Sequence, residues 1–218
     1  MQINFRFPLF LLLISSVIFL TSFSYKKSLQ KGYLVYKDGT KKEGLISPFT
    51  GVDVNIKIKK DEKAKAEKVS TSLLKYIVLE NEKDHSFDTL HALKIGIHFM
   101  SKFKIHDDIQ LAHRIYNSDK VEGFVVYYSD YDFYGPGRSF MPSNNMIIYT
   151  RMPNQDYMVW MSEKISGGIG ISINKIMRTN FKKEINGRCP AMDKQIDEKG
   201  YKIEDFIEML QEYDKMCQ

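Results

Sequence analysis

Cysteine is scarce in this chain. Its 218 residues include two cysteines, Cys189 and Cys217, and both fall in the last thirty positions. A zinc site would need further cysteine or histidine ligands beside them, and that stretch holds none. In an oxidising compartment an even pair most simply forms one disulfide, with two separate buried thiols as the alternative.

Long apolar runs are also rare, and the one near the N-terminus is short. Residues 8–23 are nearly all apolar, but a membrane-spanning helix needs roughly 18–20 such residues. Arg6 precedes this run, and the small residues Ser22 and Ser24 flank Phe23. This pattern is typical of a secretory signal with small-x-small cleavage.

The N-terminal segment therefore predicts export. Residues 1–24 are interpreted as a signal peptide that is cleaved near Ser24, which leaves a periplasmic or secreted protein beginning at Tyr25. The lack of a cysteine near the cleavage point argues against a lipoprotein. The alternative is an uncleaved inner-membrane anchor through residues 8–23.

A strong excess of one charge is missing. Lys and Arg number 32 against 27 Asp and Glu, so the net charge is +5, and loss of Arg6 with the signal would leave +4. The densest basic stretch, Lys57–Lys68, is interrupted by Asp61, Glu62 and Glu67, whereas a nucleic-acid binder concentrates its cations on one face. We interpret the stretch as the solvated face and turn of a hairpin, and we predict no nucleic-acid partner.

Recognised catalytic and cofactor motifs are absent. Ser172–Lys175 fits S-x-x-K, but the further Ser and Lys-Thr-Gly motifs of penicillin-binding enzymes do not occur. Gly167–Gly170 lacks the Lys-Ser/Thr of a phosphate loop. The sequence therefore predicts no cofactor and gives no sign of an enzyme.

The histidines invite a metal hypothesis, because all five fall in one thirty-residue window and imidazole is a common zinc and copper ligand. No pair has the i, i+4 spacing of His-Glu-x-x-His or the spacing of a short H-x-H strand motif. If the region is extended, His98 and His106 share a polar face with lysines that repel a cation. We predict solvated or hydrogen-bonded histidines and no metal site. The histidines are His85, His91, His98, His106 and His113, and the lysines are Lys94, Lys102 and Lys104.

The body of the chain has β periodicity. Gly32–Tyr36 and Glu43–Ile46 flank the Asp-Gly turn Lys37–Thr40, which predicts a hairpin. Apolar and polar residues alternate from Val52 to Lys59, as in a half-buried strand, and Ser70–Lys75 predicts a short capped helical turn. Leu90–Ile115 fits strands but shares some helical spacing, and we interpret it as strands. Further strands are predicted at Tyr76–Leu79, Gly123–Tyr128, Asn145–Tyr149 and Tyr157–Met161.

The end of the chain changes to helical periodicity. Met177, Phe181 and Ile185 are four residues apart, Pro190 suits a first helical position, and a last apolar stripe runs from Ile203 to Tyr213. We predict three short helices, with the last two forming an αα-hairpin. Cys189 would begin one helix and Cys217 would end the other, so the two would meet at the open end of the hairpin and form the disulfide.

These patterns predict an α+β fold, an antiparallel β-rich body of sheets or small barrel-like units followed by a short C-terminal helical unit. The β-rich domain spans residues 25–172 and the helical unit residues 173–218. Lys42–Ile46 and Val121–Val125 are weakly similar, so the body could contain two similar β units, 30–80 and 88–162.

The chain combines four features: Gly32–Thr40, Phe181–Lys183, the Cys189-Pro190 pair and a closing helix with Cys217. On these features it resembles a group of secreted β-rich proteins of gliding and gut-dwelling Gram-negative bacteria. The resemblance implies a β-rich body with a C-terminal helical unit, and it implies no activity. The chain departs from the group in its long aromatic segment Tyr127–Phe140, where such proteins often carry Gly/Ser-rich sequence.

That aromatic segment is the candidate surface for a ligand or partner. Aromatic side chains beside Gly/Pro turns suit a sugar, a peptide or a protein, and the candidate residues are Tyr131, Phe133, Tyr134 and Arg138. The alternative is a packed surface loop. We expect a non-catalytic binding or structural module with an unknown protein or glycan partner in the cell envelope. A hydrolase with a site assembled from dispersed residues, including a histidine, and a β-barrel carrier of an apolar ligand are the alternatives.

Overall fold

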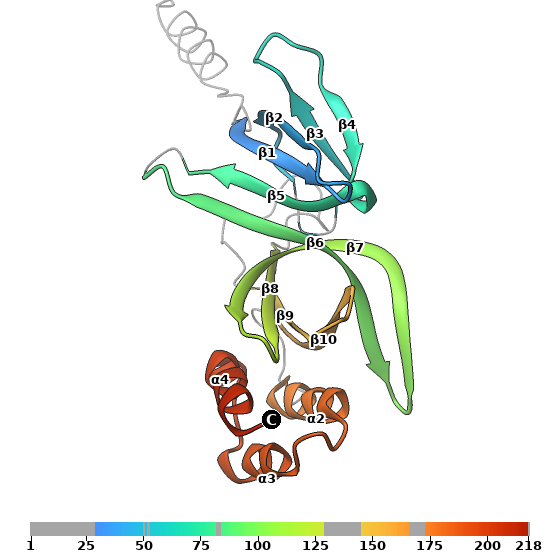
Figure 1. The fold of residues 1–218 in the computed structure, drawn as a ribbon, viewed down its shortest axis with the longest axis vertical. Coiled ribbons are helices and arrows are strands. Elements are labelled where there is room, and N and C mark those ends of the chain that lie inside the picture. Colours follow the sequence, from blue (N-terminus) through green and yellow to red (C-terminus); the bar gives the residue numbers. More distant parts are fainter. Residues whose placement is uncertain are drawn as a thin grey trace, which may run out of the picture.

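A computed structural model describes residues 29–49, 51, 53–81, 84–128, 145–165 and 173–217. The described strands form one hydrogen-bonded sheet in the order β10-β9-β8-β7-β6-β5-β1-β2-β3-β4. Figure 1 shows the first five strands at one end of an elongated molecule, a barrel in the middle and the helices at the other end. The predicted signal segment, residues 1–24, lies outside the described residues.

The first hairpin forms as predicted. Strands β1 (Gln30–Tyr36) and β2 (Lys41–Ile46) pair antiparallel around a turn in which Gly39 has a φ of 87°. Glycine adopts this left-handed conformation without the steric penalty that a side chain brings. The Asp-Gly signal in the sequence therefore identified the turn correctly.

Two further glycines allow neighbouring strands to approach closely. Gly32 and Gly44 face each other in the β1–β2 pair. A Cβ atom at Gly32 would lie 2.2 Å from the carbonyl oxygen of Val78, and one at Gly44 would lie 2.3 Å from that of Lys59. Because backbone occupies this space, both positions require glycine.

The charged stretch forms the predicted hairpin turn between β3 (Asn55–Lys59) and β4 (Glu67–Ser70). The strand begins at Asn55, later than the alternation from Val52 predicted, and Val54 is 69% exposed. Its carbonyl oxygen accepts hydrogen bonds from the backbone N–H and the hydroxyl of Thr71. Val54 thus supports the 3₁₀ turn η1 (Thr71–Leu73) instead of the sheet, and the predicted cap, Ser70, accepts a hydrogen bond from the N–H of Ser72.

Strand β5 (Leu74–Glu80) leads to a long hairpin, β6 (Phe87–Phe99) and β7 (Lys102–Asn117), which confirms that residues 90–115 are strands. One face of this hairpin contributes Leu90 and Leu111 to the core of the N-terminal sheet. The other face contributes Leu93 and Ala112 to a second core. Because both faces are buried in this part of the hairpin, it lacks a clean apolar–polar alternation there.

Strands β8 (Glu122–Tyr128), β9 (Asn145–Arg151) and β10 (Tyr157–Lys164) complete a five-stranded barrel with β6 and β7. The closing pair is parallel and joins Tyr157–Val159 of β10 to Lys94–Gly96 of β6. The body is therefore β-rich as predicted, but this pair makes the barrel mixed and not purely antiparallel. Side chains from all five strands fill its interior: Leu93, Ile95, Ala112, Phe124, Val126, Tyr149 and Met158.

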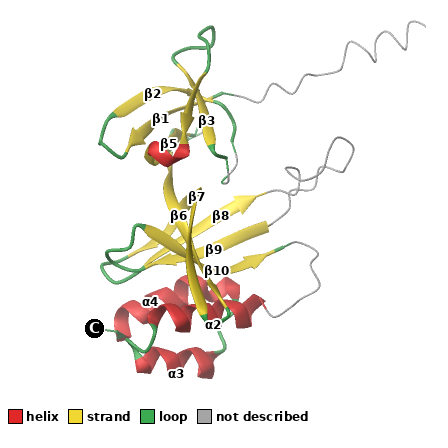
Figure 2. Ribbon diagram, turned by 90° about the vertical axis from the view of Figure 1, so that its right-hand side faces the viewer, coloured by secondary structure: helices red, strands yellow, loops and turns green. Residues whose placement is uncertain are grey.

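The predicted helices are α2 (Ile173–Ile185), α3 (Pro190–Lys199) and α4 (Phe206–Met216), the last preceded by the 3₁₀ turn η3 (Ile203–Asp205). They pack on the barrel at the end away from the N-terminal sheet (Figures 1 and 2). Phe181 and Leu210 are fully buried in a core that also contains Val159 of β10. No helix in the described ranges is long and apolar enough to cross a membrane.

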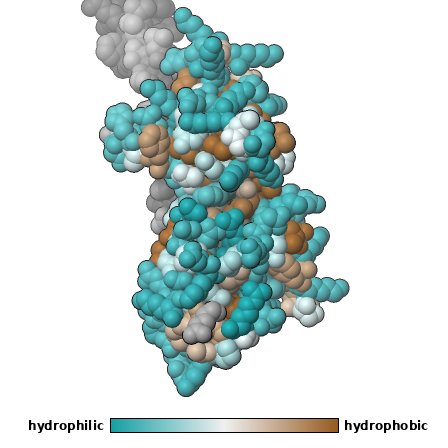
Figure 3. All heavy atoms as spheres, viewed as in Figure 1, coloured by the Kyte–Doolittle hydropathy of each residue, from teal (hydrophilic) through white to brown (hydrophobic). Residues whose placement is uncertain are grey.

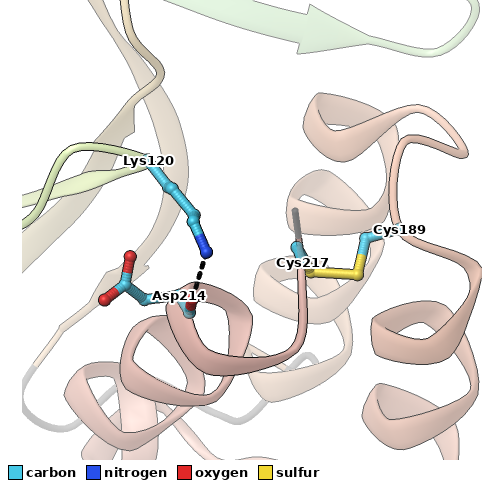
Figure 4. Close-up of a disulfide and its surroundings, with 4 residues drawn as sticks. All are labelled: Lys120, Cys189, Asp214 and Cys217. Carbon is cyan, nitrogen blue, oxygen red and sulfur yellow. Dashed lines mark hydrogen bonds between the residues drawn. A yellow bond between two sulfur atoms is a disulfide. The ribbon is translucent and has the colours of Figure 1, made fainter.

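The predicted disulfide is present. Cys189 precedes α3 and Cys217 follows α4, and their Cα atoms are 5.5 Å apart. Figure 4 shows the bridge at the open end of the αα-hairpin, close to the point where Lys120 Nζ donates a 2.7 Å hydrogen bond to the carbonyl oxygen of Asp214. A disulfide of this kind indicates an oxidising compartment.

Candidate functional site

A cavity of about 330 Å³ lies where the N-terminal sheet meets the barrel. Strands that are distant in the sequence supply its walls, and the segment that follows β2 supplies one side. The lining residues are Gln30, Ile46, Ser47, Pro48, Phe49, Gly51, Leu79, Asp88, Leu90, Leu111, His113 and Tyr127.

The segment after β2 is fixed to the barrel at Gly51. The carbonyl oxygen of Gly51 accepts a 2.8 Å hydrogen bond from the N–H of Leu111 on β7. A Cβ atom at Gly51 would lie 2.5 Å from Cγ1 of Val126, so only glycine fits against β8 at this point without a shift of that side chain. Gly51 lines the cavity together with Ser47 and Phe49 of the same segment.

The lining includes several polar side chains, and three of them, His113, Asp88 and Tyr127, lie close together. His113 Nδ1 on β7 lies 2.9 Å from Asp88 Oδ1 on β6, and the side chains of this pair are 30% and 51% exposed. The Tyr127 ring at the end of β8 lies 5.9 Å from the His113 ring, and Tyr127 is 61% exposed. Gln30 donates through Nε2 to the carbonyl oxygen of Glu80 at 3.1 Å.

Apolar side chains line the rest of the cavity. Ile46 and Leu111 are each 1% exposed, and Leu79 and Leu90 are at most 9% exposed. The cavity thus combines an apolar floor with an imidazole, a carboxylate, an amide and an exposed phenol. Small-molecule sites typically have this composition, with a few polar groups that fix the orientation of the ligand.

The predicted surface residues, Tyr131, Phe133, Tyr134 and Arg138, lie outside the described residues, and their role stays a prediction. Tyr127, the first residue of the same aromatic segment, lines the cavity.

The histidines do not converge on a single point. Three of them are hydrogen-bonded to different carboxylates: His85 to Glu80, His98 to Glu184 and His113 to Asp88. No group of three or more His, Cys, Asp or Glu side chains within the described ranges could hold a metal ion.

His91 is enclosed between aromatic rings. Its ring centroid lies 6.0 Å from that of Tyr76 and 5.7 Å from that of Phe124. Burial, together with the positive charges of Arg114 and Arg151, lowers the pKa of His91 to about 4. His91 is therefore neutral near pH 7.

His98 is not on the solvated lysine-rich face that strand parity predicted. Its side chain is 15% exposed, its ring packs 4.7 Å from that of Phe103, and Nε2 lies 3.1 Å from Glu184 Oε2. The β6–β7 register places His98 opposite Phe103, on the face away from Lys102 and Lys104, and α2 supplies Glu184 on that side. The bond links barrel and helix, which is a structural role.

The Glu184 carboxylate has further partners at this junction. Gln155 Nε2 donates to Glu184 Oε1 at 2.7 Å and to the Tyr157 hydroxyl at 3.3 Å. Burial and the negative charge of Glu184 raise the pKa of Tyr157. This network joins β6, the β9–β10 turn and α2, and each of its polar groups is used in packing the helices on the barrel.

Sequence reasoning missed the contributions of Asp88, Ser47 and Gln30 to the cavity. Asp88 meets His113 because the β6–β7 register places Leu90 opposite His113. Ser47 and Gln30 reach the cavity only through the packing of the N-terminal sheet on β7.

Comparisons with protein-family models, with curated proteins and with solved structures find no significant match to this chain.

Proposed function

We propose that this protein is an exported, non-catalytic binding module of the cell envelope that holds a small polar ligand in the cavity between the N-terminal sheet and the barrel. The observation that carries the proposal is the gathering of His113, Asp88, Gln30 and Tyr127 around an apolar floor. The disulfide supports an oxidising compartment, and the predicted signal peptide supports the periplasm or the exterior as that compartment.

A sugar unit of an envelope glycan suits this lining best. A sugar ring has an apolar face that can lie on the ring of Tyr127 or Phe49, while its hydroxyl groups can reach the carboxylate of Asp88 and the amide of Gln30. The volume of about 330 Å³ lies at the lower end of the range for small-molecule sites. One or two sugar rings therefore fit better than a folded protein surface.

Calorimetric titration of the full chain with soluble fragments of envelope glycans tests this proposal. We expect binding that weakens about tenfold in Tyr127→Ala, since an aromatic contact is worth about 0.5–1.5 kcal/mol beyond its burial. Tyr33→Ala is the matched control, because Tyr33 lies on β1 outside the cavity. Failure of every fragment to bind, or equal weakening in both variants, would refute the proposal.

A hydrolase is the second candidate, and one observation favours it. Ser47 lines the same cavity as the hydrogen-bonded pair His113 and Asp88, which are the residue types of a serine hydrolase. In the described ranges, however, the hydroxyl of Ser47 makes no hydrogen bond to His113. Turnover of ester or amide substrates that His113→Ala abolishes and His106→Ala retains would establish this candidate in place of the binding module.

The carrier alternative receives less support. A small barrel can hold an apolar ligand only if its interior is open, and side chains from all five strands fill this one. Mass spectrometry of solvent extracts from the native protein checks the point, and a bound lipid would favour the carrier.

A further inference from the structure

The tip of the β6–β7 hairpin exposes four apolar side chains, with Phe99 on the face of Lys102 and with Phe103 and Ile105 on the opposite face. Phe99 is 68% exposed, Met100 78%, Phe103 40% and Ile105 43%. β10 pairs with β6 only at Lys94–Gly96, and β8 pairs with β7 only from His113 onward, so the hairpin extends beyond the barrel. Figure 1 shows this extension and Figure 3 shows hydrophobic side chains reaching the surface on that side.

The charge around this tip has one sign. Residues 95–106 contain two lysines, Lys102 and Lys104, and no Asp or Glu, whereas Lys94 pairs with Asp107 further from the tip. Lys102 and Lys104 are exposed next to the apolar side chains. A third cation is held in place, because Lys183 Nζ on α2 donates a 3.0 Å hydrogen bond to the carbonyl oxygen of Met100. The nearest acid on α2, Glu184, is 6% exposed and is bonded to His98 and Gln155.

The base of the tip is fixed before any partner arrives. The Phe103 ring packs 4.7 Å from the His98 ring and 5.6 Å from the Tyr157 ring. Met100 has a φ of 54°, which makes the turn tight and directs the chain back into β7. The tip therefore loses little conformational freedom when it binds a surface.

We propose that this tip docks on the surface of an anionic phospholipid bilayer, with Phe99 and Met100 entering the interface and the lysines contacting headgroup phosphates. Aromatic and other apolar side chains beside lysines have the composition of interfacial membrane contacts. A stable protein interface needs about 800 Å² from each partner, and a projecting turn with four apolar side chains is poorly shaped to supply it.

The test places an indole at the tip of the full chain. The chain has a single tryptophan, Trp160, so the double variant Phe99→Trp/Trp160→Phe reports only on position 99. With vesicles of brominated phosphatidylglycerol we expect a blue shift and quenching of this indole, and neither with phosphatidylcholine. The readout is local, so the apolar residues 8–23 do not affect its interpretation if they bind lipid.

The matched control is Phe87→Trp/Trp160→Phe. Phe87 begins β6 and is 68% exposed, the same as Phe99 at the other end of the strand, and its indole should stay unquenched. If replacing Trp160 unfolds the protein, the Phe99→Trp and Phe87→Trp variants are each compared with the parent chain. Adding Lys102→Gln and Lys104→Gln should raise the lipid concentration for half-maximal quenching roughly thirtyfold.

Three outcomes would overturn the proposal. They are no quenching at position 99 with phosphatidylglycerol, equal quenching at positions 87 and 99, and equal quenching with neutral and anionic vesicles. A blue shift at position 99 that needs no lipid and grows with protein concentration would assign the tip to a second copy of the chain.

Discussion

Removal of the disulfide should destabilise the helical unit by an amount that the loop length sets. Cys189 and Cys217 are 28 residues apart, so in the chain-entropy account the bridge contributes roughly 3.5 kcal/mol at 25 °C. Both residues are also at most 5% exposed within the core of the helical unit. The loss would be a large share of the 5–15 kcal/mol that typically stabilises a native protein.

The perturbation is Cys189→Ala/Cys217→Ala, studied by urea unfolding beside the oxidised and the reduced parent. With a slope of about 2 kcal/mol per molar urea, a loss of 3–4 kcal/mol lowers the midpoint by about 1.5–2 M. Far-ultraviolet circular dichroism follows the helices, and the fluorescence of Trp160 follows β10 of the barrel. Helices that unfold at lower urea than the barrel would show that the bridge acts locally.

Two results would refute this reasoning. The first is a reduced parent that unfolds at the same urea concentration as the oxidised parent. The second is a double variant whose urea midpoint still falls when reductant is added. Because this variant has no cysteine left, the effect of reductant would then have a cause other than the disulfide. Mass spectrometry of unreduced, alkylated protein provides the accompanying check on the bridge itself.

Three other perturbations probe different parts of the fold by the same urea measurement. Phe181→Ala should cost about 3–5 kcal/mol because Phe181 is fully buried against Tyr213, and a loss below 1 kcal/mol would contradict the packing. Acidification from pH 7 to 4 should destabilise the protein through His91: its folded pKa is about 4 against 6.5 unfolded, so the unfolded chain takes up the proton first as the pH falls through this window. The full pKa shift corresponds to a loss of about 3 kcal/mol in the free energy of unfolding, which we reduce to about 2 kcal/mol because His91 is partly exposed. The His91→Phe variant should lack this part of the pH dependence. Glu122→Gln should cost about 1–3 kcal/mol, because Glu122 is 13% exposed and pairs with both Arg114 and Arg151. The control Glu43→Gln, at a site that is 73% exposed, should leave the midpoint nearly unchanged.

The elements that the sequence predicted well are those whose signal is local. The Asp38-Gly39 turn, the Ser70 cap and Pro190 at the start of α3 each act within a few residues, and each appears where it was expected. The disulfide was predicted because the cysteines are an even pair in an exported chain and because an antiparallel αα-hairpin brings Cys189 and Cys217 to the same end.

The features that depend on distant contacts were harder to predict. The part of the β6–β7 hairpin around Leu90–Ile95 and Leu111–Ala112 is buried on both faces, which removes the alternation that usually identifies a strand. The parallel closing pair between Tyr157 and Lys94 leaves no local pattern. The pairing of Asp88 with His113 depends on the register of two long strands and on the irregularity after Lys94, which shifts that register.

The parallel closing pair also constrains the order in which the chain can fold. The edge of β6 at Lys94–Gly96 stays unpaired until Tyr157–Val159 is synthesised, 63 residues later (157 minus 94). Strands β1–β5 pair with one another within the first 80 residues, with Gly32 opposite Leu79, and can form early, while the barrel stays open until β10 arrives. During that interval an unpaired strand edge is available to other chains, so aggregation should be most severe in chains truncated before residue 157.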